Sequence, residues 1–218
     1  MSKLTVILKD GSKREVDKGI TLAELAESIS HSLAKNALVA KVDGQVVDLK
    51  YKLQHNAKVE FCTFDDPEGK DAFRHTTSHI LAQAVKRLYS NVKLVIGPAI
   101  ANGFYYDIDT PHNFVPEDLE KIQAEMERIV KEDLPLERME VSREQALQLF
   151  EERDEIYKME LIRDLPENVA ISLYKQGEFI DLCAGPHLSS TGKVKAIKLQ
   201  SLAGAYWRGD EKRKMLQR

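Results

Sequence analysis

Two short histidine-containing motifs, far apart in the chain, most constrain how this sequence can fold. The first is His75-Thr76-Thr77-Ser78-His79, and the second is Cys183-Ala184-Gly185-Pro186-His187. In each motif the outer residues are four positions apart (79 − 75 and 187 − 183), a spacing that puts both side chains on one face of a helix. A fold that uses both motifs together must bring two distant segments to one place.

The four outer side chains offer nitrogen and sulfur ligands of the kind that form a tetrahedral zinc site. Without a metal, the same groups suit a polar pocket for hydrolysis. The alternative is a structural reading, because a helical histidine pair is often a surface feature and a lone cysteine is usually a small buried apolar residue. A site is favoured by the Gly-Pro turn before His187, by the strand-like run Glu178–Leu182 before Cys183, and by half of the six histidines falling in the motifs.

Composition excludes membrane and disulfide-rich classes. The chain has 218 residues, of which 43% are hydrophobic and 31% charged, an ordinary balance for a globular protein. Its apolar runs are far shorter than the ~20 residues of a membrane span, and its first residues lack the apolar core of a signal peptide. The two cysteines, Cys62 and Cys183, form no disulfide framework, which favours a reducing, cytoplasmic setting.

The net charge of −3 means that any RNA contact must come from local basic patches. Two candidate patches also fit an ordinary solvated surface. They are Lys193, Lys195 and Lys198, and then Arg208, Lys212, Arg213 and Lys214.

Residues 1–63 are expected to form a small domain with a β-grasp fold, because two strands, a helix and further strands follow in that order. Asp10-Gly11 and Asp43-Gly44 are turn signals, and Thr21-Leu22-Ala23-Glu24 is a capping box that opens a helix through Ile29. The expected strands are Leu4–Leu8, Lys13–Val16, Leu38–Val42, Gln45–Val47 and Ala57–Cys62. This domain contains no cluster of titratable residues, so we expect a binding or packing module.

Residues 64–69 are expected to be an acidic linker with proline and glycine, followed by a larger α+β domain over residues 70–218 with a mainly antiparallel sheet. Apolar periodicity, prolines and capping boxes locate its elements. They are a helix from about Lys70 to Tyr89, a glycine-punctuated strand region Asn91–Asp109, helices from Pro116 to Glu132 and after Ser142, and strands Val169–Tyr174, Glu178–Leu182 and Lys195–Leu202.

The motifs that the sequence contains and those that it lacks exclude several enzyme classes. A zinc protease needs His-Glu-x-x-His, and here Thr76 follows His75. The sequence also lacks a Gly-x-Ser-x-Gly elbow and the glycine-rich nucleotide-binding loops. A His/Cys cluster near Asp181 remains, with Lys158 available from the preceding segment. These groups suit water activation and stabilisation of a developing oxyanion.

Four segments identify a family. They are Arg74-His75-x3-His79, Gly97-Pro98-x-Ile100-x-x-Gly103-Phe104-Tyr105-Tyr106-Asp107, Asp181-x-Cys183-x-Gly185-Pro186-His187 and Ala203-Gly204-Ala205-Tyr206-Trp207-Arg208-Gly209-Asp210. Over essentially its whole length the chain resembles the N-terminal half of bacterial threonyl-tRNA synthetases. The resemblance implies a TGS domain followed by an editing domain that is shared in outline with alanyl-type editing proteins.

The resemblance implies hydrolysis of seryl-tRNA(Thr), which arises when the synthetic site mistakes serine for threonine. A methyl-sized difference is worth only ~1–3 kcal/mol, so a second pocket that crowds out the extra methyl is needed. By resemblance, His75 or His79 would hold the terminal ribose and the water, Lys158 would stabilise charge on the ester, and Asp181 would hold the substrate ammonium. The full expected site is His75, His79, Lys158, Asp181, Cys183 and His187, with substrate contacts from Gly97, Pro98, Tyr105 and Asp107.

The resemblance also implies that editing needs no cofactor, with zinc on His75, His79, Cys183 and His187 as the less favoured option. The expected partner is the 3′ end of tRNA(Thr) carrying serine, not a membrane. By resemblance, a synthetase core with the ATP site would follow this segment and form a homodimer. The motifs of that core do not occur in this sequence. We therefore expect the chain to be a fragment or a free-standing editor that does not aminoacylate tRNA. The alternatives are a non-enzymatic TGS-containing RNA-binding module with structural zinc, and an alanyl-type zinc-dependent editor.

Overall fold

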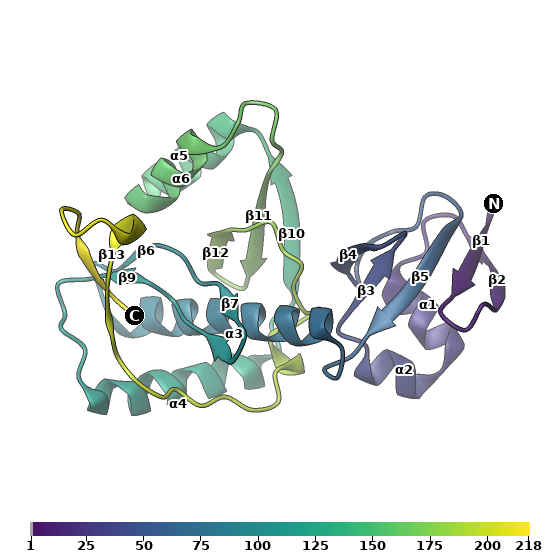
Figure 1. Ribbon diagram of the computed structural model, residues 1–218, viewed down its shortest axis with the longest axis horizontal. Helices are drawn as coiled ribbons and strands as arrows, with labels where there is room; N and C mark the ends of the chain where they lie inside the picture. Colours follow the sequence, from purple (N-terminus) through teal and green to yellow (C-terminus); the bar gives the residue numbers. More distant parts are fainter. Residues whose placement is uncertain (1) are drawn as a thin grey trace. The chain divides into compact units, whose positions relative to one another are not determined.

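The computed structural model describes residues 2–218, which fall into two compact units (Figure 1). Unit 1 comprises the chain up to Arg74 together with Gly185–Ser189, and unit 2 comprises His75–Ala184 and Ser190–Arg218. The boundaries expected at residues 63 and 70 stay predictions. None of the helices in the described residues combines the length and apolarity that a membrane crossing requires.

Unit 1 contains a five-stranded sheet in the order β2-β1-β5-β3-β4, in which β1 and β5 are parallel and the other pairs antiparallel. This arrangement confirms the β-grasp prediction. The elements are β1 (Lys3–Leu8), β2 (Lys13–Asp17), α1 (Leu22–Ile29), α2 (His31–Asn36), β3 (Val39–Val42), β4 (Gln45–Asp48) and β5 (Ala57–Cys62).

Local sequence signals explain most of unit 1. The capping box forms as predicted, with the Thr21 amide donating to the Glu24 carboxylate at 2.8 Å and the Glu24 amide donating to the Thr21 hydroxyl at 3.2 Å. The turn residues Asp43 and Gly44 both have positive φ, at 50° and 87°, as a tight hairpin turn requires. The sequence did not indicate α2, which begins immediately after Ser30 closes α1.

Unit 2 combines four helices of eight or more residues with short antiparallel strands, and the predicted α+β class is confirmed. The helices are α3 (Pro67–Leu88, whose first residues belong to unit 1), α4 (Pro116–Glu132), α5 (Arg143–Glu152) and α6 (Ile156–Asp164). The strands are β6 (Lys93–Leu94), β7 (Ala99–Ile100), β8 (Gly103–Phe104), β9 (Ile108–Asp109), β10 (Leu136–Val141), β11 (Ile171–Gln176), β12 (Phe179–Leu182), β13 (Gly204–Tyr206) and β14 (Met215–Gln217), and the 3₁₀ turns are η1 (Thr191–Lys193) and η2 (Trp207–Gly209).

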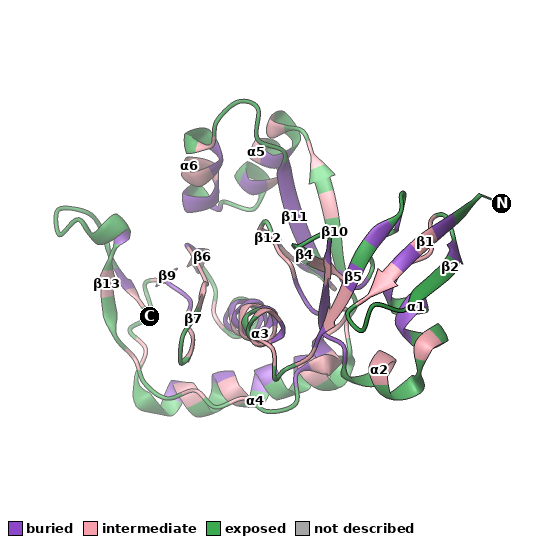
Figure 2. Ribbon diagram, turned by 45° about the vertical axis from the view of Figure 1, so that its right-hand side comes forward, coloured by how far each residue is buried: buried purple, intermediate pink, exposed green. Residues whose placement is uncertain are grey.

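Within unit 2, α3 runs between α4 on one side and the β10-β11-β12 sheet on the other (Figures 1 and 2). Helices α5 and α6 pack on this sheet through an apolar core that includes Phe150, Ile162 and Leu173. The central strand β11 is buried over most of its length (Figure 2). Strands β11 and β12 pair antiparallel, as predicted, with Tyr174 opposite Asp181.

Two element predictions in unit 2 need correction. Helix α3 begins at Pro67 rather than Lys70, because proline is favoured in the first turn of a helix and does not block its start. The predicted strand Lys195–Leu202 is wrong: within the described residues this segment joins no sheet, and strand β13 begins only at Gly204. Its backbone bonds elsewhere, since the Leu199 amide donates to the Gln123 side chain at 3.1 Å.

Candidate functional site

The part of α3 that carries the first histidine motif is buried although its side chains are polar. Thr76, Thr77, Ser78 and His79 are each at most 2% exposed. Buried polar groups are costly unless they are hydrogen-bonded, and the Ser78 hydroxyl lies 2.6 Å from the Gly97 carbonyl oxygen, to which it donates. The motif therefore lies inside unit 2 and is not a surface pair of histidines.

A buried triangle of polar groups lies beside this motif. The Lys158 ammonium is 2.6 Å from Asp181 Oδ1 and donates to the Tyr106 hydroxyl at 2.9 Å. The Tyr106 hydroxyl in turn donates to Asp181 Oδ2 at 2.6 Å. All three residues are at most 3% exposed. A buried ion pair is maintained only with good geometry and additional hydrogen bonds, and the tyrosine provides one.

His79 adjoins this triangle, with its Nε2 atom 3.6 Å from Asp181 Oδ2. Its ring makes an edge-to-face contact with His75, with centroids 5.1 Å apart. Burial, together with the charges of His75 and Lys158, holds the pKa of His79 well below its usual value. A neutral imidazole at this position can accept a hydrogen bond, and burial likewise keeps Tyr106 protonated by raising its pKa well above 10.0.

The second motif reaches the same place through β12. Cys183 follows β12 directly, and its Sγ atom lies 3.4 Å from His75 Nε2. The Cys183 backbone is fixed on both sides, because its amide donates to the Ser172 carbonyl at 3.1 Å and its carbonyl accepts from the Ser172 hydroxyl at 2.6 Å. The structure thus brings His75, His79, Lys158 and Asp181 together with Cys183.

His187 lies in the segment Gly185–Ser189, which groups by its contacts with unit 1, and its side chain is fully buried. Within unit 2, one ligand atom from each of His75, His79 and Cys183 lies within 4.8 Å of the other two. Histidine nitrogen and cysteine sulfur are ligands that zinc prefers. These three residues are therefore compatible with part of a metal site.

The four expected substrate-contact residues have different surroundings. Gly97 touches the cluster, and a Cβ added there would lie 2.2 Å from Tyr106 Cδ2, so only glycine fits. The Pro98 carbonyl accepts from the Tyr105 amide at 3.4 Å. Asp107 is 3% exposed and forms two contacts with the Arg218 guanidinium at 2.7 and 2.9 Å. Both oxygens of the Asp107 carboxylate are therefore already paired with a side chain of the protein.

A cavity of about 390 Å³ lies in unit 2, and Tyr105 and Tyr106 both line it. The Arg218 guanidinium is 3.7 Å from the Tyr105 ring centroid at its wall. Since the Tyr106 hydroxyl belongs to the triangle, the tyrosine separates this cavity from Lys158 and Asp181. Polar groups such as Asn102 and Lys198 also line the cavity.

Tyr106 is the cluster residue that the sequence reading missed. Two tyrosines follow each other in the chain. Tyr106 is 1% exposed, whereas Tyr105 is partly exposed. The sequence alone does not show which of the two is buried against Lys158 and Asp181.

Comparison with known proteins shows which domains and proteins the chain is similar to. Residues 4–63 match the TGS domain, and residues 171–218 match the threonyl and alanyl tRNA synthetase second additional domain. Threonine–tRNA ligases from Acetivibrio thermocellus, Desulforamulus reducens and Clostridioides difficile are 63%, 58% and 59% identical to the chain over 215 residues. The alignments cover 99% of this chain and 34% of each relative, so the chain spans about a third of their length.

The family matches fall on the elements described above. The TGS match covers the β-grasp sheet, and the second match contains the β11-β12 hairpin with Asp181 and Cys183. The chain is therefore similar over 99% of its length to about a third of these threonine–tRNA ligases, and it carries matches to a TGS domain and, after it, to the threonyl and alanyl tRNA synthetase second additional domain.

Proposed function

We propose that this chain is an editing deacylase that hydrolyses seryl-tRNA(Thr) to serine and tRNA(Thr). The observation that supports this most is the buried Lys158–Asp181–Tyr106 triangle against His79, next to the His75–Cys183 contact. Buried titratable groups gathered in this way are typical of a catalytic site. The second additional domain and the threonine–tRNA ligase relatives support the substrate class.

In the proposed reaction a water oxygen attacks the ester carbonyl carbon of the seryl group. The bond between that carbon and the ribose oxygen breaks, the ribose oxygen takes up one proton of the water, the other proton passes to solvent, and serine leaves as its carboxylate. His75 or His79 orients the water and the terminal ribose, since a neutral imidazole accepts a hydrogen bond. Lys158 stabilises the negative charge that develops on the carbonyl oxygen.

For Asp181 we propose a role other than the expected binding of the substrate ammonium. Its two oxygens lie 2.6 Å from the Lys158 ammonium and from the Tyr106 hydroxyl. A substrate ammonium would have to displace one of these buried partners, at a cost. In our proposal Asp181 therefore holds the Lys158 ammonium in place, and the pocket wall, including Cys183, excludes the extra methyl group of threonine.

We propose that hydrolysis needs no metal, although His75, His79 and Cys183 of unit 2 carry zinc-type ligand atoms that lie close together. If zinc is held, His75, His79 and Cys183 would be among its ligands, and it would supply Lewis-acid chemistry there. Elemental analysis of protein purified without chelator tests this part. One zinc per chain, lost together with activity on chelation, would overturn it.

The remaining proposals concern the whole protein. The chain aligns with about a third of the length of its relatives. We propose that the partner is the seryl-bearing 3′ end of tRNA(Thr), and that aminoacylation belongs to the part of the relatives outside this match. We also propose that the whole protein forms a homodimer through that part and is located in the cytoplasm.

The direct test is deacylation of seryl-tRNA(Thr) by the chain, with and without chelator. We expect hydrolysis in both conditions, and loss of it in the double variant His75→Ala/His79→Ala with the fold retained. Absence of hydrolysis, or full activity of the double variant, would contradict the proposal.

A further inference from the structure

Helix α3 carries a polar stripe that extends beyond the two histidines. His75, His79, Gln83 and Arg87 follow each other at intervals of four residues. Residues four apart on an α-helix lie one above another, so these side chains share one slowly winding face. The stripe faces the β11-β12 hairpin along its length.

Each residue of the stripe has a partner on the hairpin or directly after it. The partners run in reverse order along the chain, so α3 and β12 lie antiparallel in a fixed register. The pairs are His75 with Cys183 at 3.4 Å, His79 with Asp181 at 3.6 Å, Gln83 with Glu178 at 2.9 Å, and Arg87 with Glu178 at 2.7 Å. The first two pairs belong to the candidate site, and the last two lie beyond it.

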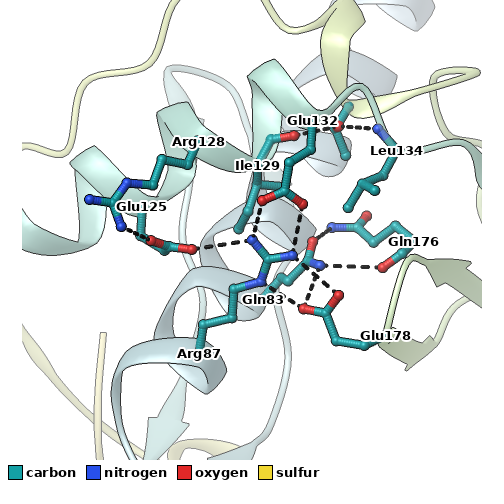
Figure 3. Close-up of polar contacts among 10 residues, drawn as sticks. Gln83, Arg87, Glu125, Arg128, Ile129, Glu132, Leu134, Gln176 and Glu178 are labelled. Atoms are coloured by element: carbon teal, nitrogen blue, oxygen red, sulfur yellow. Dashed lines mark hydrogen bonds and ion pairs between the residues drawn. The ribbon is translucent and has the colours of Figure 1, made fainter.

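Among the residues of the two pairs that lie beyond the candidate site, Gln83 is the most constrained. Its side chain is 1% exposed, and its amide nitrogen donates to the Gln176 carbonyl at 3.3 Å as well as to Glu178 (Figure 3). Its amide oxygen accepts from the Gln176 side chain at 2.8 Å. A buried amide with both groups engaged tolerates little sliding, because each lost bond leaves a desolvated polar group.

Arg87 extends this contact to three carboxylates (Figure 3). It binds Glu178 on the hairpin at 2.7 and 3.2 Å, and Glu132 on α4 at 2.7 and 2.9 Å. Glu125 on α4 lies 3.2 Å away. Paired contacts between a guanidinium and a carboxylate are geometrically specific. The hydrogen bond from Arg87 lowers the pKa of Glu178 to about 2.

We propose that Gln83 and Glu178 are positioning residues that hold α3 and β12 in the register that the His79–Asp181 contact requires. This inference rests on the proposed function. Gln83 lies one helical turn after His79, and Glu178 lies three residues before Asp181 (181 − 178). The two positioning residues therefore adjoin the candidate site on both elements. Strand β12 is an edge strand of its sheet, which leaves side chains to fix it against α3.

The structure offers a matched control at the same arginine. Glu132 and Glu178 both pair with Arg87 and both are exposed to solvent, at 40% and 59% of their side-chain surface. Only Glu178 lies on the hairpin that carries Asp181. Loss of the Glu132 carboxylate removes an ion pair of the same kind and leaves the α3–β12 contact in place.

The test uses the variants Gln83→Leu and Glu178→Ala, the control Glu132→Ala, and Glu178→Gln, which keeps an acceptor for Gln83. In single-turnover deacylation of seryl-tRNA(Thr), we expect the first two to lower the rate constant roughly 10- to 100-fold, since small displacements of catalytic groups cost this much. The enzyme concentration that gives half of the maximal rate constant should change by less than about twofold. Glu132→Ala should behave as the unmodified chain, and Glu178→Gln should restore most of the rate.

A second readout does not depend on the reaction. The chain has two cysteines, and iodoacetamide labelling followed by mass spectrometry gives a separate rate for Cys183, beside His75, and for Cys62, in unit 1. Gln83→Leu and Glu178→Ala should change the rate of Cys183 only. If the chain shows no deacylation at all, the proposed function fails, and labelling still decides the register proposal.

Unchanged kinetics together with unchanged labelling in folded Glu178→Ala would overturn the proposal. Equal effects of Glu132→Ala and Glu178→Ala would also overturn it, because the loss of any ion pair with Arg87 would then have the same effect. If Gln83→Leu does not fold, judged by its thermal unfolding, the solvent-exposed position of Glu178 keeps the second variant informative.

Discussion

Replacing Tyr106 with phenylalanine tests the polar triangle at its least expected member. The substitution removes one oxygen and leaves the buried ring in place. That oxygen donates to Asp181 at 2.6 Å and accepts from Lys158 at 2.9 Å. The direct Lys158–Asp181 contact of 2.6 Å remains, so the ion pair loses a supporting partner without being broken.

The expected magnitude follows from these contacts. A hydrogen bond to a charged group contributes ~1.5–3 kcal/mol, and we expect the free energy of unfolding of unit 2 to fall by about that much. Burial raises the pKa of Tyr106 well above 10.0. A raised pKa gives stability that is fully present below the unfolded-state value of about 10 and is lost as the pH rises towards the folded value. The difference between variant and unmodified chain should therefore be constant from pH 6 to about pH 9.

Urea unfolding followed by tryptophan fluorescence measures this effect. The chain has one tryptophan, Trp207, which is 5% exposed and packs on Tyr157 with ring centroids 5.5 Å apart, so the signal reports unit 2. Tyr89→Phe is the control, since that hydroxyl donates to Asp118 at 2.9 Å away from the triangle. Tyr106→Phe should also slow deacylation about tenfold, and Tyr89→Phe should not. A Tyr106→Phe chain as stable and as active as the unmodified one would refute the reasoning.

Three further predictions concern Gly97, Glu178 and the fragment 70–218. Gly97→Ala places a Cβ 2.2 Å from the Tyr106 ring and should cost ~1–3 kcal/mol of unfolding free energy in urea; unchanged stability would mean that Tyr106 moves freely. Glu178 has a pKa of about 2 instead of 4.5, so its stabilisation is present above about pH 4.5 and lost towards pH 2. Because its side chain is 59% exposed, Glu178→Gln should differ from the unmodified chain by less than about 1 kcal/mol at pH 7 and by less still at pH 3; an equal gap at both would contradict this. Residues 70–218 alone should unfold cooperatively, and a soluble fragment without a cooperative transition would refute the two-domain prediction.

Local signals explain where the sequence reading succeeded. The Thr21–Glu24 capping box, the Asp43-Gly44 turn and the apolar periodicity of α3 each act within a few residues, so they are visible without tertiary structure. The β11-β12 hairpin followed from its glycine turn and strand composition. Cys183 could be placed near Asp181 because one strand delivers both.

Tertiary context explains the rest. Helix α6, which carries Lys158, begins after Glu155, whose side chain makes no cap hydrogen bond within the helix and instead binds Lys86 at 2.6 Å. Its start therefore had no capping signal to read. The run Lys195–Leu202 has strand-like alternation but bonds to α4 instead of a sheet. Gln83 is indistinguishable by sequence from any polar helix residue, and only packing shows its partners.

The ratio of two rates tests the central claim most directly. The same chain is incubated with seryl-tRNA(Thr) and with threonyl-tRNA(Thr), and the rate constants for ester hydrolysis are compared under single-turnover conditions. A pocket that crowds out one methyl group should favour the seryl ester by at least ~10-fold, the lower end of what a methyl-sized difference provides. Equal hydrolysis of both esters would contradict an editing function for this chain.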